Sequence, residues 1–149
     1  MEAPSRESDP LSYADFTRQV IEEFRANGGR VGGPFEAADL VLLTTTGARS
    51  GRPHTVPLGV VHDGERLLVV GSAGGAPRHP AWYHNVLAHP EVTVEHGDEV
   101  FAAHAEPAAG ADRDRLFALV VSVAPGYADY QRATTRTLPV VVLRRVTPP

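Results

Sequence analysis

The sequence contains no cysteine, and all fourteen of its basic residues are arginine. Without cysteine, disulfides, thiolate zinc sites and iron–sulfur clusters are excluded, and a reducing compartment is favoured. Without lysine, Schiff-base and pyridoxal-phosphate chemistry is excluded, because both need a lysine amine. The sequence also has no apolar run long enough to cross a membrane and no signal-peptide core at its start. These absences predict a cytoplasmic protein.

Length and charge narrow the class further. A chain of 149 residues is typical of one domain, which we place at residues 12–149 after a polar, disordered stretch over residues 1–11. The net charge of −4 argues against a protein that binds nucleic acid. Between residues 40 and 90, however, the only acids are Asp63 and Glu65, against four arginines and five histidines. This basic middle predicts a site for an anionic small molecule.

The first periodic segment predicts a helix. Phe16, Val20 and Phe24 recur every four residues, which indicates a helix over residues 12–27 that ends at Gly28 and Gly29. Its apolar stripe fits three roles: packing on the core, capping a substrate pocket, or touching a membrane. Membrane contact is the least favoured, because the helix carries acidic residues and little positive charge.

The remaining segments favour strands more than helices. The dipeptides Asp63-Gly64 and Gly97-Asp98 each separate two apolar runs and predict β-hairpins. Pro57 predicts an edge strand or a bulge. Short helices are expected over residues 80–90 and 110–124, a helical turn or loop over 127–137, and a final strand over 138–146. This order favours an α+β, mainly β fold, a small antiparallel barrel of about six strands with flanking helices.

Common catalytic signatures are missing. The sequence has no GxSxG nucleophile elbow, no GxGxxG dinucleotide fingerprint and no GxxxxGK[ST] phosphate loop. His79, His84 and His89 are five residues apart, which distributes them around a helix rather than along one face. Because metal-ligand spacing is absent, we expect no metal site.

Two glycine-rich loops carry the basic residues of the middle segment. The first, over residues 44–58, presents Arg49, Arg52 and His54, which suit a phosphate or carboxylate. The second, over residues 69–85, surrounds the basic pair Arg78 and His79 with glycines and prolines and leads into the only tryptophan, Trp82. Both loops are also compatible with ordinary turns. Trp82 fits two roles, a wall for a ring system or an anchor to the core.

A third loop, over residues 125–131, contributes two phenols. Tyr127 and Tyr130 are three residues apart, on one face of a helical turn. Such a pair is suited to hydrogen-bonding a substrate oxygen or delivering a proton. Packing of two half-buried tyrosines against the sheet is the alternative interpretation.

Together the three loops resemble a known family. LLTTTGARSGRPHTVPL, GGAPRHPAWYHN and PGYADYQ followed by TLPVVVL are similar, in this order, to motifs of the deazaflavin-dependent nitroreductases, within the split-barrel flavin/deazaflavin oxidoreductases. The resemblance runs from about residue 39 to residue 143. It implies a split β-barrel like that of flavin reductases and pyridoxamine-phosphate oxidases. It also implies the polyanionic coenzyme F420, in preference to FMN, and hydride transfer from F420H2 to a quinone, enone or nitro compound.

The resemblance also implies site residues. Tyr127 and Tyr130 match positions that face the substrate, and we take them as the candidate catalytic residues. The residues expected at the cofactor are Arg49, Ser50, His54, Thr55, Val56, Pro57, Leu58, Ser72, Gly74, Gly75, Ala76, His79, Pro80 and Trp82.

Some positions depart from the family pattern. Some members have arginine at the position of His54, lysine at that of Ala73 and tyrosine at that of Ala124. Neutral His54 binds an anion less strongly than a guanidinium does, and without the third phenol the substrate range of relatives does not transfer. Other functions therefore stay open: a dedicated biosynthetic enone reductase, an FMN-binding enzyme, or a non-catalytic cofactor carrier. The expected partner is a small-molecule acceptor, and the expected assembly is a monomer or a homodimer.

Overall fold

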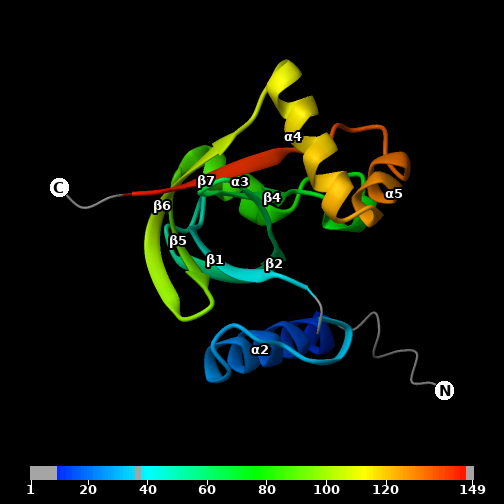
Figure 1. The fold of residues 1–149 in the computed structure, drawn as a ribbon. Helices are drawn as coiled ribbons and strands as arrows, with labels where there is room; N and C mark the ends of the chain where they lie inside the picture. Colours follow the sequence, from blue (N-terminus) through cyan, green and yellow to red (C-terminus); the bar gives the residue numbers. More distant parts are fainter. Residues whose placement is uncertain (1–9, 36–37, 147–149) are drawn as a thin grey trace.

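A curled antiparallel sheet forms the centre of the molecule (Figure 1). The computed structural model describes residues 10–35 and 38–146, and within them the strand order is β2-β1-β5-β6-β7-β4-β3. Every paired strand is antiparallel to its neighbour, and α-helices flank the sheet. The predicted mainly β split barrel with flanking helices is thus confirmed. The strands are β1 (Leu40–Thr46), β2 (Pro53–Gly59), β3 (Val61–Asp63), β4 (Arg66–Val70), β5 (Glu91–His96), β6 (Glu99–Pro107) and β7 (Val140–Arg145).

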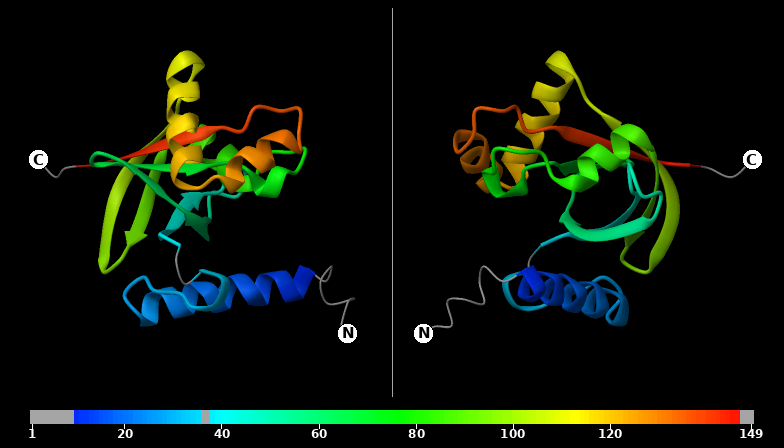
Figure 2. Two further views of the ribbon diagram at one scale, coloured as in Figure 1. Left: turned by 45° about the vertical axis from the view of Figure 1, so that its right-hand side comes forward. Right: turned by 180° about the vertical axis from the view of Figure 1, so that it is seen from behind.

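The helices lie on two sides of the sheet. Helix α2 lies along one side of the barrel, and α4 and α5 lie on the other (Figures 1 and 2). In the described residues no helix combines the length and apolar character needed to cross a membrane. The helices are α2 (Pro10–Ala26), α3 (Ala81–Ala88), α4 (Gly110–Val123) and α5 (Gly126–Arg132), with the short 3-10 helices η1 (Gly33–Phe35) and η2 (Ala73–Gly75).

Two boundaries differ from the sequence-based expectation. Helix α2 begins at Pro10, so residues 10 and 11 are helical, while residues 1–9 lie outside the described part of the chain. The segment after Pro125, expected as a helical turn or loop, forms the longer helix α5. Its first turn is closed by the Ala128 amide, which donates to the Pro125 carbonyl at 3.0 Å. This places Tyr127 and Tyr130 on successive turns of a regular helix.

A corner at Val60 curls the sheet into a barrel. The first apolar run of the expected Asp63-Gly64 hairpin is in fact two strands: β2 pairs with β1 at one edge, and β3 pairs with β4 at the other. The Val60 amide donates to the Asp39 carbonyl at 3.0 Å and fixes the corner beside the start of β1. As predicted, Pro57 lies on an edge strand, where a missing amide hydrogen costs no ladder bond.

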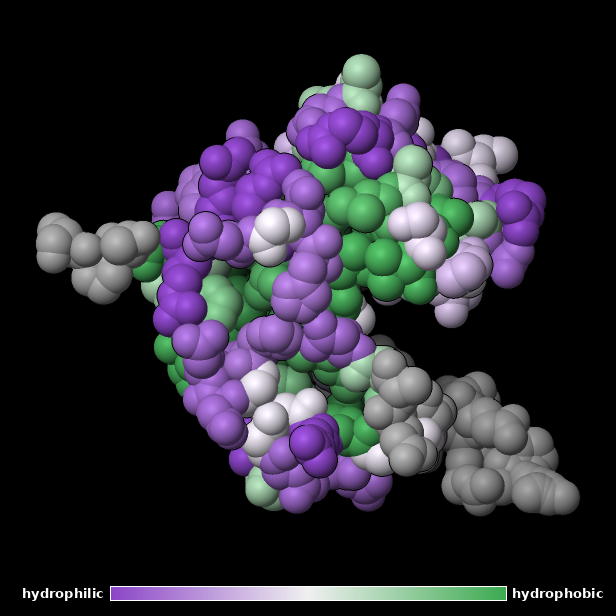
Figure 3. All heavy atoms as spheres, viewed as in Figure 1, coloured by the Kyte–Doolittle hydropathy of each residue, from purple (hydrophilic) through white to green (hydrophobic). Residues whose placement is uncertain are grey.

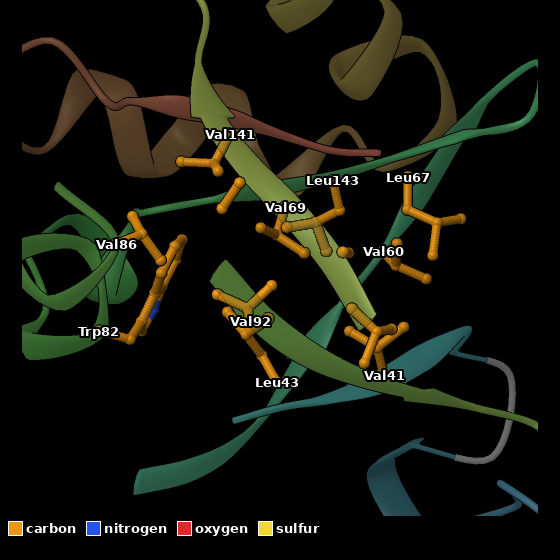
Figure 4. Close-up of a cluster of buried hydrophobic side chains, with 13 residues drawn as sticks. Val41, Leu43, Val60, Leu67, Val69, Trp82, Val86, Val92, Val141 and Leu143 are labelled. Carbon is orange, nitrogen blue, oxygen red and sulfur yellow. The ribbon is translucent and has the colours of Figure 1, made fainter. Parts of the chain in front are cut away.

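Buried hydrophobic residues in the described chain fall into three clusters. The largest fills the barrel interior, where Trp82 and Val86 of α3 pack against side chains of the sheet, including Leu43, Val92 and Val141 (Figure 4). A second cluster lies between the sheet and α4. In the third, α2 buries Val20 and Phe24 against β1, so most of its apolar stripe packs on the protein's own sheet.

Candidate functional site

Two adjoining cavities lie beside the barrel in the described part of the chain. One cavity, of about 750 Å³, is formed by the β1–β2 loop and α3, and we call it the polar cavity because Arg49, Ser50 and His54 are among its lining residues. The other, of about 500 Å³, lies between α2, β2, η2 and α5, and we call it the apolar cavity because most of its lining residues are apolar. The two share Val56, Ala81 and Trp82, so they adjoin at a common wall, and we refer to them together as the cleft.

The polar cavity gathers the predicted anion-binding loop. Arg49, Ser50 and His54 all line it, and the Ser50 hydroxyl accepts a hydrogen bond from the Arg52 amide at 3.1 Å. His54 Nε2 lies 3.5 Å from the same hydroxyl. At Gly47 a Cβ atom would lie 2.4 Å from Ser50 Oγ and 3.0 Å from His54 Nε2, so any larger residue would displace these side chains. The glycine therefore places three polar side chains on one wall.

Asn85 holds this loop against α3, a role that the sequence analysis missed. Its side chain is buried, donates to Thr45 Oγ1 at 3.0 Å and accepts from the Ala48 amide at 3.0 Å. Both of its hydrogen bonds reach residues on or next to the β1–β2 loop. The signal in the sequence is a single amide in a short, mostly apolar helical stretch, AWYHNVLA. His84, which also lines the polar cavity, was likewise not predicted.

The electrostatics of the cleft favour an anion. Among the described residues, no aspartate or glutamate lines either cavity. Within the same part of the chain, Arg49 and Arg52 form no ion pair, unlike most arginines elsewhere in the structure. The first turn of α3 also leaves backbone amides without helical acceptors next to the shared wall. The donor set therefore suits a ligand with phosphate or carboxylate groups.

The apolar cavity opens to solvent between α2 and the side of the molecule that carries α5 (Figure 3). Phe16 and Val20 of α2 line it from one side, and Pro57 and Leu58 of β2 form its floor. The apolar stripe of α2 thus has two environments. Val20 and Phe24 are buried in the core, whereas Phe16 is exposed and lines the cavity. Of the three roles considered, the structure shows packing on the core, and it also places Phe16 at the cavity.

Tyr127 and Tyr130 have different environments. Tyr127 lines the apolar cavity, where its hydroxyl would lie 3.2 Å from a Cβ placed at Gly59. Burial, and then the neighbouring Tyr130 phenol, raise the pKa of Tyr127 above its ordinary value. The Tyr130 ring packs edge-on against that of Tyr127, with 5.7 Å between the ring centroids. Tyr130 is 41% exposed and lines neither cavity. Tyr127 is therefore the phenol positioned to meet a ligand.

Arg136 fixes the second glycine-rich loop, and the sequence analysis did not identify it. Its guanidinium donates to the carbonyls of Gly71 at 3.0 Å, Ser72 at 2.8 Å and Ala76 at 2.8 Å. It also donates to Nδ1 of His79 at 2.9 Å. Burial, then Arg136 and His84, lower the pKa of His79, which keeps the acceptor imidazole neutral.

These bonds hold an unusual backbone in place. Ala73 has a φ of 46°, in the left-handed region that strains a residue with a Cβ. The strained residue lines the apolar cavity together with Ser72 and Gly74. Gly75, at a φ of +85°, packs against α5, where a Cβ would lie 2.9 Å from that of Ala133. The loop is therefore clamped between Arg136 and α5 and presents its outer surface to the cleft.

The predicted cofactor residues divide into two groups. Most line the cleft: Arg49, Ser50, His54, Val56, Pro57, Leu58, Ser72, Gly74, Pro80 and Trp82. The others do not line either cavity. The Thr55 hydroxyl lies 2.7 Å from that of Thr44, and Gly75, Ala76 and His79 make the contacts described above. Trp82 is anchored in the core cluster, where it is 6% exposed, and it also lines both cavities.

Sequence comparison identifies the family. The family model described as F420H(2)-dependent quinone reductase matches residues 16–145. The chain belongs to this family. Membership confirms the expected deazaflavin-dependent oxidoreductase and its coenzyme F420. The matched region contains both loops of the cleft, helix α5 and residues 16–26 of α2.

Related proteins agree with this assignment. An F420H(2)-dependent quinone reductase of Mycobacterium tuberculosis is 41% identical over 126 residues, covering 82% of this chain and 85% of the relative. A solved structure of an F420-H2 dependent reductase has 42% identity and a TM-score of 0.66, covering 71% of this chain and 94% of the other. A second structure, described as a domain-swapped dimer, has 35% identity and a TM-score of 0.68, covering 91% and 100%.

Proposed function

We propose that this F420H(2)-dependent quinone reductase family member reduces a quinone in the apolar cavity with F420H2 bound along the cleft. The observation that carries the proposal is the division of the cleft. One cavity presents Arg49, Ser50 and His54 with no acidic lining residue in the described chain, and the adjoining one is mostly apolar. A coenzyme with an anionic phosphate and glutamate tail and a flat ring matches both halves. The expectation of a quinone rests on the family's description.

The chain's residues fit such a coenzyme. The phosphate and tail would be held by the Arg49 guanidinium, the Ser50 hydroxyl and the His54 imidazole, of which Arg49 would donate charge-assisted hydrogen bonds. The ring would lie at the shared wall, beside Trp82 and Val56. Cavities of about 750 and 500 Å³ are in the range typical of small-molecule sites. Because the loops on both sides are clamped by Asn85 and Arg136, the cleft is largely formed before the coenzyme binds.

The protein's part in the reaction is to position the acceptor and to polarise the acceptor oxygen. When bound, F420H2 supplies a hydride from its ring carbon. The apolar lining from Phe16 to Leu58 holds a flat acceptor and excludes water. The Tyr127 hydroxyl donates a hydrogen bond to the acceptor oxygen on which negative charge develops. Its raised pKa keeps this phenol protonated, and therefore a donor, at physiological pH.

Coenzyme binding is tested first, with Trp82 as the reporter, because it is the only tryptophan and lines both cavities. Titration with oxidised F420 is expected to quench its fluorescence saturably, whereas FMN leaves it largely unchanged. Arg49→Gln is expected to weaken F420 binding about tenfold, since a charge-assisted hydrogen bond is lost. Arg144→Gln, on the exposed end of β7, serves as the matched control. Equal affinities in the two variants would contradict the placement of the anionic tail.

Turnover is tested separately from binding. With F420H2 and a soluble quinone, an enone and a nitroaromatic compared side by side, the quinone is expected to be reduced fastest. Tyr127→Phe is expected to lower kcat by about 100-fold, the usual cost of losing one donor to a developing oxyanion, with F420 affinity retained. Tyr130→Phe, the matched control outside the cavity lining, is expected to keep turnover. A Tyr127→Phe enzyme with full turnover would remove the phenol from the mechanism.

A further inference from the structure

Two histidine side chains and one aspartate side chain lie together at the rim of the barrel, outside the coenzyme cleft. His62 Nε2 donates to Asp39 Oδ2 at 2.6 Å, and His96 Nε2 donates to Asp39 Oδ1 at 2.9 Å. The two imidazole centroids are 5.4 Å apart. None of the three residues lines either cavity of the cleft.

The fold brings these residues together from three distant parts of the chain. Asp39 immediately precedes β1, His62 is the middle residue of β3, and His96 ends β5. β5 pairs antiparallel with β1, so its last residue lies next to the start of β1. The corner bond from the Val60 amide to the Asp39 carbonyl brings β3 to the same place. Spacings of 23 and 34 residues explain why no sequence motif revealed the cluster.

We propose that Asp39, His62 and His96 form a binding site for a divalent transition-metal ion such as Zn²⁺. One ligand atom from each side chain lies within 4.8 Å of the other two. Tetrahedral Zn²⁺, with bonds of about 2.0–2.2 Å to nitrogen and oxygen, needs ligand atoms about 3.3 Å apart. Only small rotations of the side chains are therefore required. Two imidazoles and a carboxylate form a ligand set that suits zinc and neighbouring first-row metals.

The surroundings leave room for the ion. The side chains of His62 and Asp39 are 49% and 46% exposed, and that of His96 is 27% exposed, so water can complete the coordination shell. The adjacent carboxylate, Glu95, is engaged by Arg25 through bonds of 2.9 and 2.8 Å. Among the described residues, the ligand set therefore consists of three protein groups. On binding, Nε2 of each imidazole loses to solvent the proton that it donates to Asp39 and coordinates the metal, and the neutral ring then carries its proton on Nδ1.

The expected effect is structural rather than catalytic. Along β1 the polar cavity is first lined by Thr45, six residues from Asp39, and six residues of extended strand span about 20 Å. An ion at Asp39 is therefore not positioned to act on the coenzyme tail. It would instead join the start of β1, the edge strand β3 and the end of β5, three elements that otherwise meet here only through hydrogen bonds. Binding to the folded chain alone raises its stability by mass action.

Calorimetric titration of the tag-free full chain with ZnCl2, after chelator treatment, tests the proposal. We expect one equivalent to bind and, at about 100 times the dissociation constant, the midpoint of thermal unfolding to rise by about 5–10 °C. Co²⁺ bound in the same place should show the visible absorption of a tetrahedral nitrogen and oxygen site. His62→Gln and His96→Gln should each abolish both signals, and circular dichroism checks that each variant is folded.

Two control variants make the result specific. His104→Gln changes an exposed histidine on β6, and His84→Gln disrupts the other close imidazole pair, His79 and His84, whose ring centroids are 5.9 Å apart. Both controls are expected to bind one Zn²⁺ like the unmodified chain. The proposal is overturned if the chain binds no Zn²⁺, if binding persists in the folded His62→Gln/His96→Gln double variant, or if His84→Gln loses it.

Discussion

Arg136 provides the sharpest test of how the cleft is built. Replacing it with glutamine removes hydrogen bonds to the carbonyls of Gly71, Ser72 and Ala76 and to His79. A charge-assisted hydrogen bond contributes about 1.5–3 kcal/mol, so the three carbonyl bonds alone give about 4.5 kcal/mol at the lower limit. Water reaches this half-buried site and replaces part of the loss, which leaves about 2–4 kcal/mol.

That destabilisation is measurable in two ways. For a chain of this size it corresponds to a fall of about 5–12 °C in the midpoint of thermal unfolding. The loop also loses the clamp that holds Ala73 in its strained conformation, so F420 affinity, followed by Trp82 fluorescence, should fall as well. Arg136→Lys keeps the charge but not the fork of donors, and should give intermediate values. Arg132→Gln, an exposed arginine on α5, is the control.

The pH dependence of stability adds a third readout of Arg136. Because the pKa of His79 is lowered in the folded protein, the unfolded chain takes up its proton first as the pH falls below about 6.5. Stability should therefore decrease in mild acid through this residue. Without Arg136 the pKa of His79 is lowered less, and the decrease should be smaller. A glutamine variant with unchanged stability, affinity and acid sensitivity would refute the assignment of Arg136 as the clamp.

Three further predictions concern other parts of the cleft. Asn85→Ala should destabilise the fold by about 1–3 kcal/mol in denaturant unfolding and weaken F420 binding, because the Ala48 amide loses its acceptor. Gly47→Ala should weaken F420 binding by displacing the loop, whereas Gly126→Ala, where a Cβ meets nothing within 4 Å, should leave it unchanged. Since the pKa of Tyr127 is raised on folding, stability should fall as the pH rises above about 10, and Tyr127→Phe should reduce that fall in alkaline unfolding curves.

Patterns local in sequence were predicted well. The four-residue spacing of Phe16, Val20 and Phe24 correctly indicated a helix, because a periodic stripe reflects burial of one face. The hairpin at Gly97-Asp98 was also correct, since glycine there supplies the positive φ of a tight turn. The family motifs then supplied the topology, which neither periodicity nor composition determines.

Features that depend on distant contacts were not predicted. Arg136 lies in TTRTLP, where nothing local distinguishes it from a solvent-exposed arginine, and its partners are about 60 residues away. The Asp39, His62 and His96 cluster exists only because the chain turns at Val60, and the sequence analysis placed a continuous strand there. Such residues acquire their roles from packing, so a single sequence contains no signal of them.

The walls of the cleft come from residues as far apart as Phe16 and Tyr127. No contiguous segment of the chain contains enough of the site to bind by itself. Affinity for the coenzyme is therefore a measure of the folded population as a whole: a molecule whose barrel has opened, or whose α2 has detached, loses the site. In a cell, supply of the coenzyme would then set how much of this protein resists unfolding and proteolysis, and mutations remote from the cleft would register as weaker apparent binding.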